Sequence, residues 1–370
     1  MKRKKILHVV SVSFSLRYFV GNQFHYFKEK GYEFHVACSA SAEFDSLAQE
    51  FDFKQFPVPV LRSINPLQDI KSIYKLYQYI RREKFDIVIT HSPKGGLIGM
   101  LAAYLAQVPT RVFFRHGLVF ETVTGLKKHL LINIERLIGF CANSIVNVSP
   151  SISKISDQLH LNRSSKNVLL GKGTCNGIDT VRFAPRAGYK NPEITTVGFV
   201  GRLSKDKGIV ELIEAWKMLS HEYGSIRLLL VGPVDERDPL PTATLDQIKK
   251  NPSIKYVGGV SDTALYYNEM DVFVLPSYRE GFPTVTLEAS ASGLPIVTTK
   301  VTGCIDSIIE NFTGLFAENT AQSLYEKIKF YIDHSEIIKE YGENGIQFVR
   351  DNFSEDYIYT EIEKKLLVCE

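Results

Sequence analysis

The sequence of 370 residues has few cysteines and no long hydrophobic run. The five cysteines are scattered without a C-x-x-C pair, which indicates reduced thiols rather than a disulfide framework or a zinc site. The longest apolar run, Leu97–Val108, is too short for a membrane-spanning helix, which needs ~20 residues. The start resembles a signal peptide, but His8 interrupts its apolar stretch and no A-x-A-like cleavage site follows. We therefore expect a cytoplasmic chain that is neither secreted nor membrane-spanning.

Motifs for two other kinds of chemistry are also missing. No G-x-G-x-x-G follows an expected strand in either half, which disfavours a nicotinamide dehydrogenase. No Asp-x-Asp follows a strand, and no cluster of His, Cys and Asp has the spacing of metal ligands. The sequence therefore predicts chemistry that uses neither a metal nor a bound cofactor.

The charge is unevenly distributed along the chain, whose 44% hydrophobic and 23% charged residues are ordinary for a globular protein. At ~150 residues per domain, the length favours two domains. Residues 1–180 hold 24 Lys and Arg against 13 Asp and Glu, or +11, whereas residues 181–370 hold 20 against 28, or −8. Basic clusters lie at Lys2–Lys5, Arg81–Lys84 and Lys127–Lys128. The split suggests an anionic surface or substrate for the N-terminal half, with solvated helix faces as the alternative.

Short apolar runs alternate with longer amphipathic stretches, which is typical of parallel sheets with helices on both faces. Strands are predicted at 6–12, 34–38, 85–90, 111–115, 144–148, 195–201, 227–232, 255–258, 271–276 and 295–299. Helices are predicted at 65–83, 208–219, 262–269, 284–292 and 321–333. The sequence thus predicts an α/β fold of two Rossmann-like domains. They span 1–175 and 193–352, joined by a linker over 176–192, and a helix over 353–370 returns to the N-terminal domain.

The segment Val274–Pro295 carries the densest set of chemically useful residues. A buried strand ends at Pro276, and Pro283 stands at the first position of the following helix, where proline is favoured. The amides and the positive dipole end of that helix form an anion site. Glu280 precedes the helix and Glu288 lies inside it, so the two carboxylates address opposite ends of one extended ligand. The alternative is that each is a solvated or capping carboxylate.

A second strand-to-helix turn, Val200–Gly208, carries two cations. Arg202 and Lys207 lie between Gly201 and Gly208. Arginine supplies a planar fork of donors and lysine a point charge, and together they suit a diphosphate at the carboxyl edge of a sheet.

These residues resemble the family 4 retaining glycosyltransferases, which have the GT-B fold of two facing Rossmann-like domains. The resemblance rests on G-R-L-x-x-x-K-G (Gly201–Gly208) and E-G-F-P-x-x-x-L-E-A (Glu280–Ala289), and it extends over nearly the whole chain. It implies that the C-terminal domain binds a nucleotide-sugar donor and the N-terminal domain an acceptor. It also implies which residues contact each part of the donor. Arg202 and Lys207, beside Gly201, would hold the diphosphate, and Glu288 would hold the ribose. The residues that would contact the sugar are Glu280, Phe282, Pro283 and Thr284.

The resemblance also implies functional residues in the N-terminal half. His116, at the end of F-F-R-H-G (Phe113–Gly117), corresponds to a histidine that touches the transferred sugar near its 6-position. The neighbouring Arg115 is a less specific candidate, with a structural ion pair as the alternative. The loop over residues 11–17 lacks the glycine pair that many members close on the donor phosphates, so Ser15 or Arg17 would substitute through side chains. Lys94, with the clusters Arg81–Lys84 and Lys127–Lys128, would meet the diphosphate of a lipid carrier or an anionic bilayer.

S-x-S near the start, H-S-P-K-G-G (His91–Gly96) and L-P-S-Y-R-E-G-F-P resemble most the bacterial members that extend polyprenyl-diphosphate-linked sugars for capsule or O-antigen. The resemblance favours a UDP-linked hexose or N-acetylhexosamine as donor and a lipid-linked or oligosaccharide acceptor, with reaction on one face of the sugar and retention. It implies no nucleic-acid partner and a place at the inner face of the cytoplasmic membrane. The alternatives are a UDP-sugar 2-epimerase, which has the same architecture, and a non-catalytic nucleotide-sugar-binding subunit.

Overall fold

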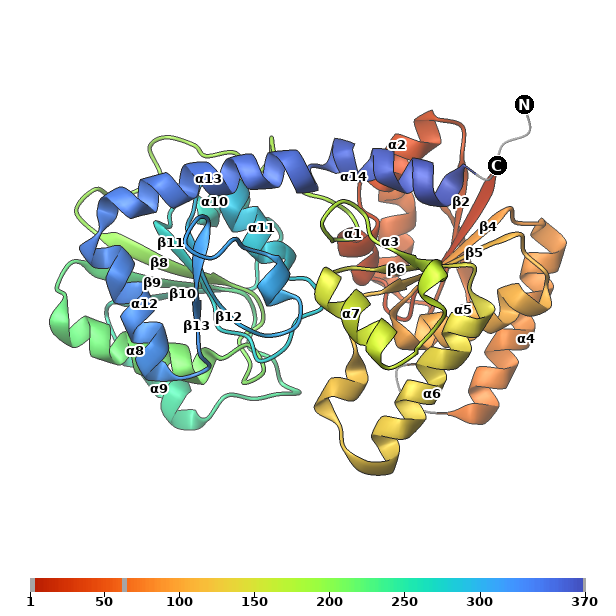
Figure 1. The fold of residues 1–370 in the computed structure, drawn as a ribbon, viewed down its shortest axis with the longest axis horizontal. Helices are drawn as coiled ribbons and strands as arrows, with labels where there is room; N and C mark the ends of the chain where they lie inside the picture. The colour runs from red at the N-terminus through yellow and green to blue at the C-terminus, as the bar shows by residue number, and fades with distance from the viewer. Residues whose placement is uncertain (1–3, 62–64, 369–370) are drawn as a thin grey trace. The chain divides into compact units, whose positions relative to one another are not determined.

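A computed structural model describes residues 4–61 and 65–368. Lys2 and Arg3 of the first basic cluster and Cys369 lie outside the described residues. The chain divides into two compact units (Figure 1). Unit 1 comprises Met1–Gly177 and Asp356–Glu370, and unit 2 comprises Ile178–Glu355.

Unit 1 is built on a seven-stranded parallel sheet in the order β3-β2-β1-β4-β5-β6-β7. Its strands are β1 (Lys5–Val9), β2 (Glu33–Cys38), β3 (Lys54–Pro57), β4 (Ile87–His91), β5 (Thr110–Arg115), β6 (Ser144–Asn147) and β7 (Asn167–Val168). Its helices are α1 (Ser15–Phe19), α2 (Gln23–Glu29), α3 (Ala42–Phe51), α4 (Pro66–Glu83), α5 (Ser92–Leu105), α6 (Gly125–Cys141) and α7 (Pro150–Gln158), and most of α14 (Glu355–Ile362) also belongs to it. The reversal of strand order beside β1 is the topological switch point at which such sheets bind ligands.

Glycines of α5 let this helix lie close against the sheet. A Cβ on Gly96 would come within 2.6 Å of the Phe113 ring, and one on Gly99 within 2.5 Å of the Thr90 side chain. The glycines of the H-S-P-K-G-G segment and the next turn therefore serve close packing. Helix α5 lies between α4 and α6 along one face of the sheet (Figure 1).

The C-terminal segment of the chain packs on α2 of unit 1. The ring of Tyr359 lies 5.0 Å from that of Tyr26, and Lys30 forms an ion pair with Glu363. Lys4 Nζ donates to the Leu367 carbonyl at 3.0 Å. Unit 1 is therefore assembled from two separate stretches of sequence.

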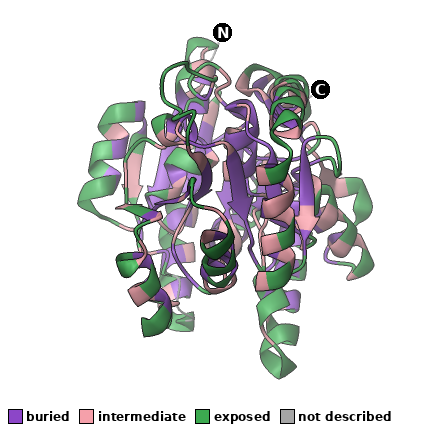
Figure 2. Cartoon of the chain, turned by 90° about the vertical axis from the view of Figure 1, so that its left-hand side faces the viewer, coloured by how far each residue is buried: buried purple, intermediate pink, exposed green. Residues whose placement is uncertain are grey.

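Unit 2 is built on a six-stranded parallel sheet in the order β10-β9-β8-β11-β12-β13. Its strands are β8 (Thr195–Val200), β9 (Ile226–Val231), β10 (Ile254–Gly258), β11 (Val272–Leu275), β12 (Ile296–Thr299) and β13 (Gly314–Ala317). Its helices are α8 (Ile209–Glu222), α9 (Thr242–Lys250), α10 (Ala264–Tyr267), α11 (Thr284–Ala291), α12 (Ala321–Asp333) and α13 (Ser335–Phe353). The strands other than the edge strand β10 are largely buried, and the helices expose their outer faces (Figure 2).

The predicted class, two parallel-sheet α/β units, is confirmed. All ten predicted strands are present, with ends that differ by up to three residues. Strands β3, β7 and β13 were not predicted, and neither were helices α1–α3, α5–α7, α9 and α13. β3 is a partly exposed edge strand ending in proline and β7 has two residues, so neither has the buried apolar run that marks a strand. The segment over 178–192 lies within unit 2, where Phe183 is buried and its carbonyl accepts from Ser292 Oγ at 2.9 Å.

Candidate functional site

The segment of unit 2 that carries the cations, Val200–Gly208, meets the segment that carries the carboxylates, Val274–Pro295, at the carboxyl edge of the sheet. Gly208 ends the turn after β8 with a φ of +69°, and a Cβ there would lie 2.0 Å from the Pro276 carbonyl oxygen after β11. Only glycine permits both this backbone conformation and this approach. The close contact holds the Gly201–Gly208 turn against the loop that carries Glu280.

Arg202 is anchored by carboxylates at this edge but keeps contact with solvent. It forms an ion pair with Asp235, which follows the neighbouring strand β9, and its second terminal nitrogen lies 3.8 Å from Asp206. The side chain of Arg202 is 42% exposed, whereas that of Asp235 is 6% exposed. Asp235 therefore fixes the guanidinium from the protein side and leaves it accessible to an anion. The sequence analysis did not identify Asp235. Its position just after β9, the strand beside β8, could have indicated that it lies at the same sheet edge as Arg202.

Lys207 and Glu280 form an ion pair that joins the two segments. Their side chains are 18% and 13% exposed, and Ser277 Oγ donates to Glu280 Oε1 at 2.7 Å. Asn319 Nδ2 donates to the carbonyls of Pro276 and Ser277 at 3.1 and 3.2 Å, which fixes the start of the same loop. Lys207 and Glu280, predicted to serve the diphosphate and the sugar, are thus brought together by direct contact.

Helix α11 begins at Thr284, the residue at which the predicted range 284–292 starts. Pro283 is the N-cap residue and Thr284 the first helical one, which corrects the prediction of proline at the first helical position. No side chain caps this end, and Thr286 Oγ1 donates to the Pro283 carbonyl at 2.6 Å. A helix start with no side-chain cap keeps its dipole available to an anion.

Glu288 is held by a residue that the sequence analysis did not identify. Tyr267 Oη donates to Glu288 Oε2 at 2.7 Å. Burial raises the pKa of Glu288, and the hydrogen bond from Tyr267 opposes this rise. The ion pair of Arg182 and Asp262, at 2.8 Å, supplies the nearby charges. Glu280 and Glu288 therefore have different partners, and neither is the freely solvated carboxylate of the alternative interpretation.

His116 of unit 1 ends a chain of three histidines. His8 Nδ1 lies 3.0 Å from His91 Nε2, and His91 Nδ1 lies 2.9 Å from His116 Nε2. The ring of Phe19 stacks on His116 with centroids 3.6 Å apart and planes 12° apart. Burial lowers the pKa of His8 and of His116 to about 3, and that of His91 well below its usual value. His116 therefore enters any reaction as a neutral ring at pH 7.

The other predicted residues of unit 1 have protein partners. Arg17 forms a two-pronged ion pair with Glu50 at 2.5 and 2.6 Å, and Ser15 Oγ donates to the Val12 carbonyl at 2.5 Å. Lys94 pairs with Asp69 of α4 at 2.5 Å, with both side chains largely buried. None of the three hydrogen-bonds to His116 within the described residues. Their roles toward an acceptor or a phosphate stay predictions. In the structure each of the three side chains binds a neighbouring group of unit 1.

Arg115 is fully buried and its guanidinium contacts four side chains. It pairs with Glu135 at 2.9 Å and donates to Asn147, Ser156 and Asn162 at 2.8–3.2 Å. For Arg115 the structure therefore shows the alternative considered from the sequence, a structural ion pair.

Two further properties were searched within residues 4–61 and 65–368. No group of three or more His, Cys, Asp and Glu side chains is arranged to hold a metal ion there. No helix in this part of the chain is both long and apolar enough to span a bilayer.

Comparisons with known proteins agree with the geometry. A family model described as glycosyl transferases group 1 matches residues 183–348, and one described as glycosyl transferase 4-like matches residues 5–147. The chain is 33% identical to the Staphylococcus aureus capsular polysaccharide biosynthesis glycosyltransferase CapM, over 98% of this chain and 97% of that protein.

Two more distant similarities cover most of the chain. Identity is 26% to the Escherichia coli UDP-Gal:alpha-D-GlcNAc-diphosphoundecaprenol alpha-1,3-galactosyltransferase, over 80% of this chain and 79% of that protein. The crystal structure of Anabaena HepE in complex with UDP and glucose shares the fold, with a TM-score of 0.77 and 18% identity over 99% of this chain and 100% of that one.

Proposed function

Since the chain belongs to the group 1 glycosyl transferases, we propose that it moves a hexose or an N-acetylhexosamine from a UDP-sugar to a lipid-linked or oligosaccharide acceptor. Membership confirms the resemblance drawn from the sequence. The proposed setting is bacterial surface polysaccharide synthesis, as for the capsular relative, and the proposed stereochemistry is retention. The observation that supports the donor site is the cluster of Arg202, Lys207 and Glu280 at one sheet edge of unit 2.

The proposed donor site neutralises a diphosphate with fixed protein charges. Arg202, anchored by Asp235, and Lys207, held beside Glu280, supply two cations, and the uncapped start of α11 supplies a third positive element. Charges fixed before the reaction stabilise the leaving diphosphate without reorganisation. In the proposed arrangement Glu288, oriented by Tyr267, accepts from the ribose diol. This site is expected to need no divalent metal.

Reaction on one face of the sugar requires no separate protein base. The bond from the anomeric carbon to the departing phosphate oxygen breaks, and the bond to the acceptor oxygen forms on the same face. The acceptor hydroxyl proton passes to the departing oxygen, so charge and atoms balance. His116 is the proposed contact of unit 1 with the transferred sugar, as a neutral hydrogen-bonding ring.

A donor panel tests this function directly. Thermal shift and hydrolysis with UDP-, GDP- and ADP-sugars should select the UDP compounds. Arg202→Ala and Lys207→Ala should each weaken donor use by about 10- to 150-fold, since a hydrogen bond to a charged group contributes ~1.5–3 kcal/mol. Lys205→Ala is the matched control, because Lys205 is an exposed cation on the same turn. UDP-sugar isomerised without acceptor would instead support the epimerase, and binding without transfer to any acceptor the non-catalytic subunit.

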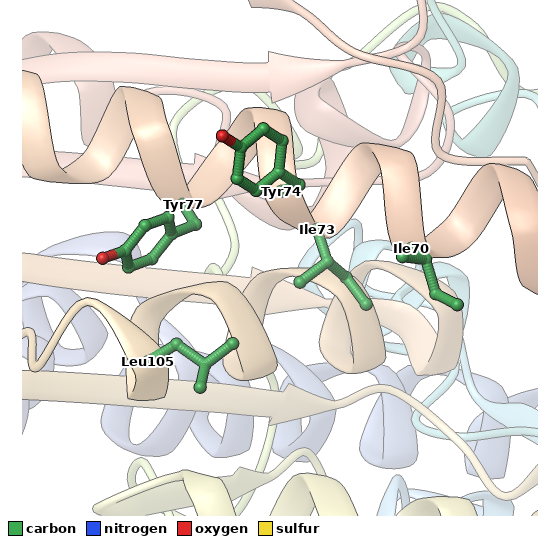
Figure 3. Close-up of a pocket in the computed structure, with 5 residues that line it drawn as sticks. All are labelled: Ile70, Ile73, Tyr74, Tyr77 and Leu105. Carbon is green, nitrogen blue, oxygen red and sulfur yellow. The ribbon is translucent and has the colours of Figure 1, made fainter.

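We also propose that unit 1 docks reversibly on an anionic membrane through α4, α5 and α6. Ile70 and Tyr74 of α4 are 63% and 60% exposed. Together with Ile73 and Tyr77 of the same helix and Leu105 of α5, they line a shallow apolar hollow (Figure 3). The surface continues onto α6, where Phe140, 65% exposed, contacts the ring of Tyr104 at 5.6 Å.

Cations flank this apolar surface. Arg81, Arg82 and Lys84 are exposed at the end of α4, and Lys127 and Lys128 at the start of α6. Apolar side chains bordered by lysine and arginine suit the interface of an anionic bilayer, where each cation near the surface contributes ~1 kcal/mol.

Vesicle sedimentation tests the docking separately from catalysis. Binding should require anionic lipid and weaken with salt. Ile70→Glu and Phe140→Glu should reduce it while leaving transfer to a water-soluble acceptor unchanged. Val181→Glu, at an 82% exposed apolar residue of unit 2, is the control. Equal binding to neutral and anionic vesicles at every salt concentration would contradict the proposal.

A further inference from the structure

Three adjacent strands of unit 1 contribute to the histidine chain at the core of the sheet. His8 lies within β1, His91 ends β4 and His116 follows β5, and β4 pairs with both β1 and β5. The rings of His8 and His91 are nearly parallel, 12° apart, and those of His91 and His116 are 28° apart. The chain thus runs across the sheet through two hydrogen bonds.

Aromatic rings enclose the chain on both sides. Phe24 and Phe34 lie 5.6 and 5.8 Å from the His8 ring, and Phe19 stacks on His116. Phe114 lies 5.1 Å from His91 and 5.9 Å from His116. Apolar walls of this kind disfavour a charged imidazole, because an ion taken out of water must be paired to be stable. The three rings are therefore neutral at pH 7.

Neutral rings couple their tautomers through the hydrogen bonds. A neutral imidazole has one N–H and one lone pair, so His91 donates to one neighbour and accepts from the other. If His91 donates to His116 Nε2, the proton of His116 lies on Nδ1. If His91 donates to His8, His116 donates through Nε2 and Nδ1 carries a lone pair. The tautomer of His91, which is coupled to that of His8, therefore decides whether His116 Nδ1 offers a proton or a lone pair.

We propose that His91 and His8 are positioning residues that fix the ring plane and the tautomer of His116 for its contact with the transferred sugar. The proposal rests on the proposed function, which makes His116 a sugar contact. Neither residue is proposed to touch the sugar, because His91 contacts His116 and His8 contacts His91. The sequence named His91 only as the first residue of H-S-P-K-G-G and His8 only as an interruption of an apolar stretch, and it gave neither a role. A histidine with a fixed tautomer offers a sugar hydroxyl either a donor or an acceptor, but not both. In metal-bound and catalytic histidines, the hydrogen-bond partner of the second ring nitrogen fixes the tautomer in the same way.

The test compares variants that break the chain with one that keeps it. His91→Leu removes both hydrogen bonds, and His8→Leu removes the distal one. His8→Asn keeps a polar atom at the position of Nδ1, the nitrogen that His8 uses, and should restore what His8→Leu loses. His35→Leu is the matched control, because His35 is a buried histidine of the adjacent strand β2 that bonds to Tyr79 and Glu33 instead.

Two readouts separate positioning from folding. His91→Leu should lower kcat for sugar transfer by about 2- to 12-fold, the loss of one typical hydrogen bond, with the Kd for free UDP unchanged. The ¹⁵N shifts of the His116 ring, assigned by the spectrum of His116→Gln, should change in His91→Leu and His8→Leu but not in His35→Leu. His8→Asn should keep the wild-type shifts and kcat.

The outcomes also separate this inference from the proposed function. Wild-type kcat and unchanged His116 shifts in His91→Leu would overturn the positioning role. A kcat loss in His35→Leu equal to that in His91→Leu would assign the effect to general destabilisation and likewise overturn it. If the wild-type protein transfers no sugar from any UDP donor, the proposed function fails, while the ¹⁵N shifts still report whether the chain sets the tautomer of His116.

Discussion

Acid should destabilise unit 1 through its buried neutral histidines. Burial lowers the pKa of His8 and of His116 from 6.5 to about 3. In the unfolded chain each ring takes up a proton below pH 6.5, whereas in the folded unit it stays neutral down to about pH 3. The stability that depends on the neutral ring is therefore complete above pH 6.5 and falls as the pH decreases. From pH 8 to pH 5 the loss is about 2 kcal/mol for each ring.

The summed effect is large compared with ordinary stability. His8 and His116 together lose about 4 kcal/mol by pH 5, against a typical total of about 5–15 kcal/mol. Burial also lowers the pKa of His91 and His35, which adds to the loss. Burial raises the pKa of Glu135, which acts in the opposite direction, because its protonated form is favoured in the folded unit. Comparison with a variant isolates one histidine from these other groups.

The assay follows the two units separately. Hydrogen exchange of peptides covering β1 and β4 reports the opening of unit 1. The fluorescence of Trp216, the single tryptophan of the chain, reports unit 2. In His8→Asn the loss of free energy between pH 8 and pH 5 should be smaller than in the wild type by about 2 kcal/mol. An identical loss in both proteins would show that His8 does not titrate as a buried neutral ring, and the reasoning would fail.

Three shorter predictions concern unit 2. Glu288→Gln should weaken free UDP by about 10-fold or more, as expected for a charged hydrogen bond, whereas Glu280→Gln should spare free UDP and lower kcat; calorimetry and transfer kinetics would show if these roles are reversed. Transfer should persist in excess EDTA, and loss with rescue by magnesium or manganese would contradict a metal-free site. Gly208→Ala should destabilise unit 2 by at least ~1–2 kcal/mol in urea denaturation, because of its left-handed backbone and its contact with Pro276, whereas Gly224→Ala, which has open space around it, should not.

The sequence was enough to expect Arg202, Lys207 and Glu280 at one place, because parallel strands end at one edge of a sheet. Arg202 and Lys207 follow one strand and Glu280 follows its neighbour, so two local patterns were enough to expect them together. Their protein partners were harder to predict. Asp235 and Tyr267 lie far along the chain from the residues that they hold, and a helical tyrosine in an apolar segment looks like a core residue.

The N-terminal half shows what a pattern along the chain does not contain. His8 was noticed only as an interruption of an apolar run, although it lies in the same hydrogen-bonded chain as His116. Lys94 has the composition of an anion-binding residue, but its partner Asp69, one helix earlier, largely buries it. Contacts across strands and between helices depend on register and packing, which periodicity does not specify.

The division of unit 1 into two stretches of sequence has a consequence for synthesis. A ribosome releases the strands of unit 1 first, yet Tyr359 and Glu363, which pack on α2, are made after all of unit 2. During translation, three residues of the α2 region therefore lack their C-terminal partners until the end of synthesis: Tyr26, Phe27 and Lys30. The whole sequence of unit 2 is available earlier, because unit 2 is one continuous stretch. Completion of the N-terminal unit thus acts as a late step of biogenesis, and a nascent chain arrested before residue 356 would expose an aromatic patch on α2 to chaperones and proteases.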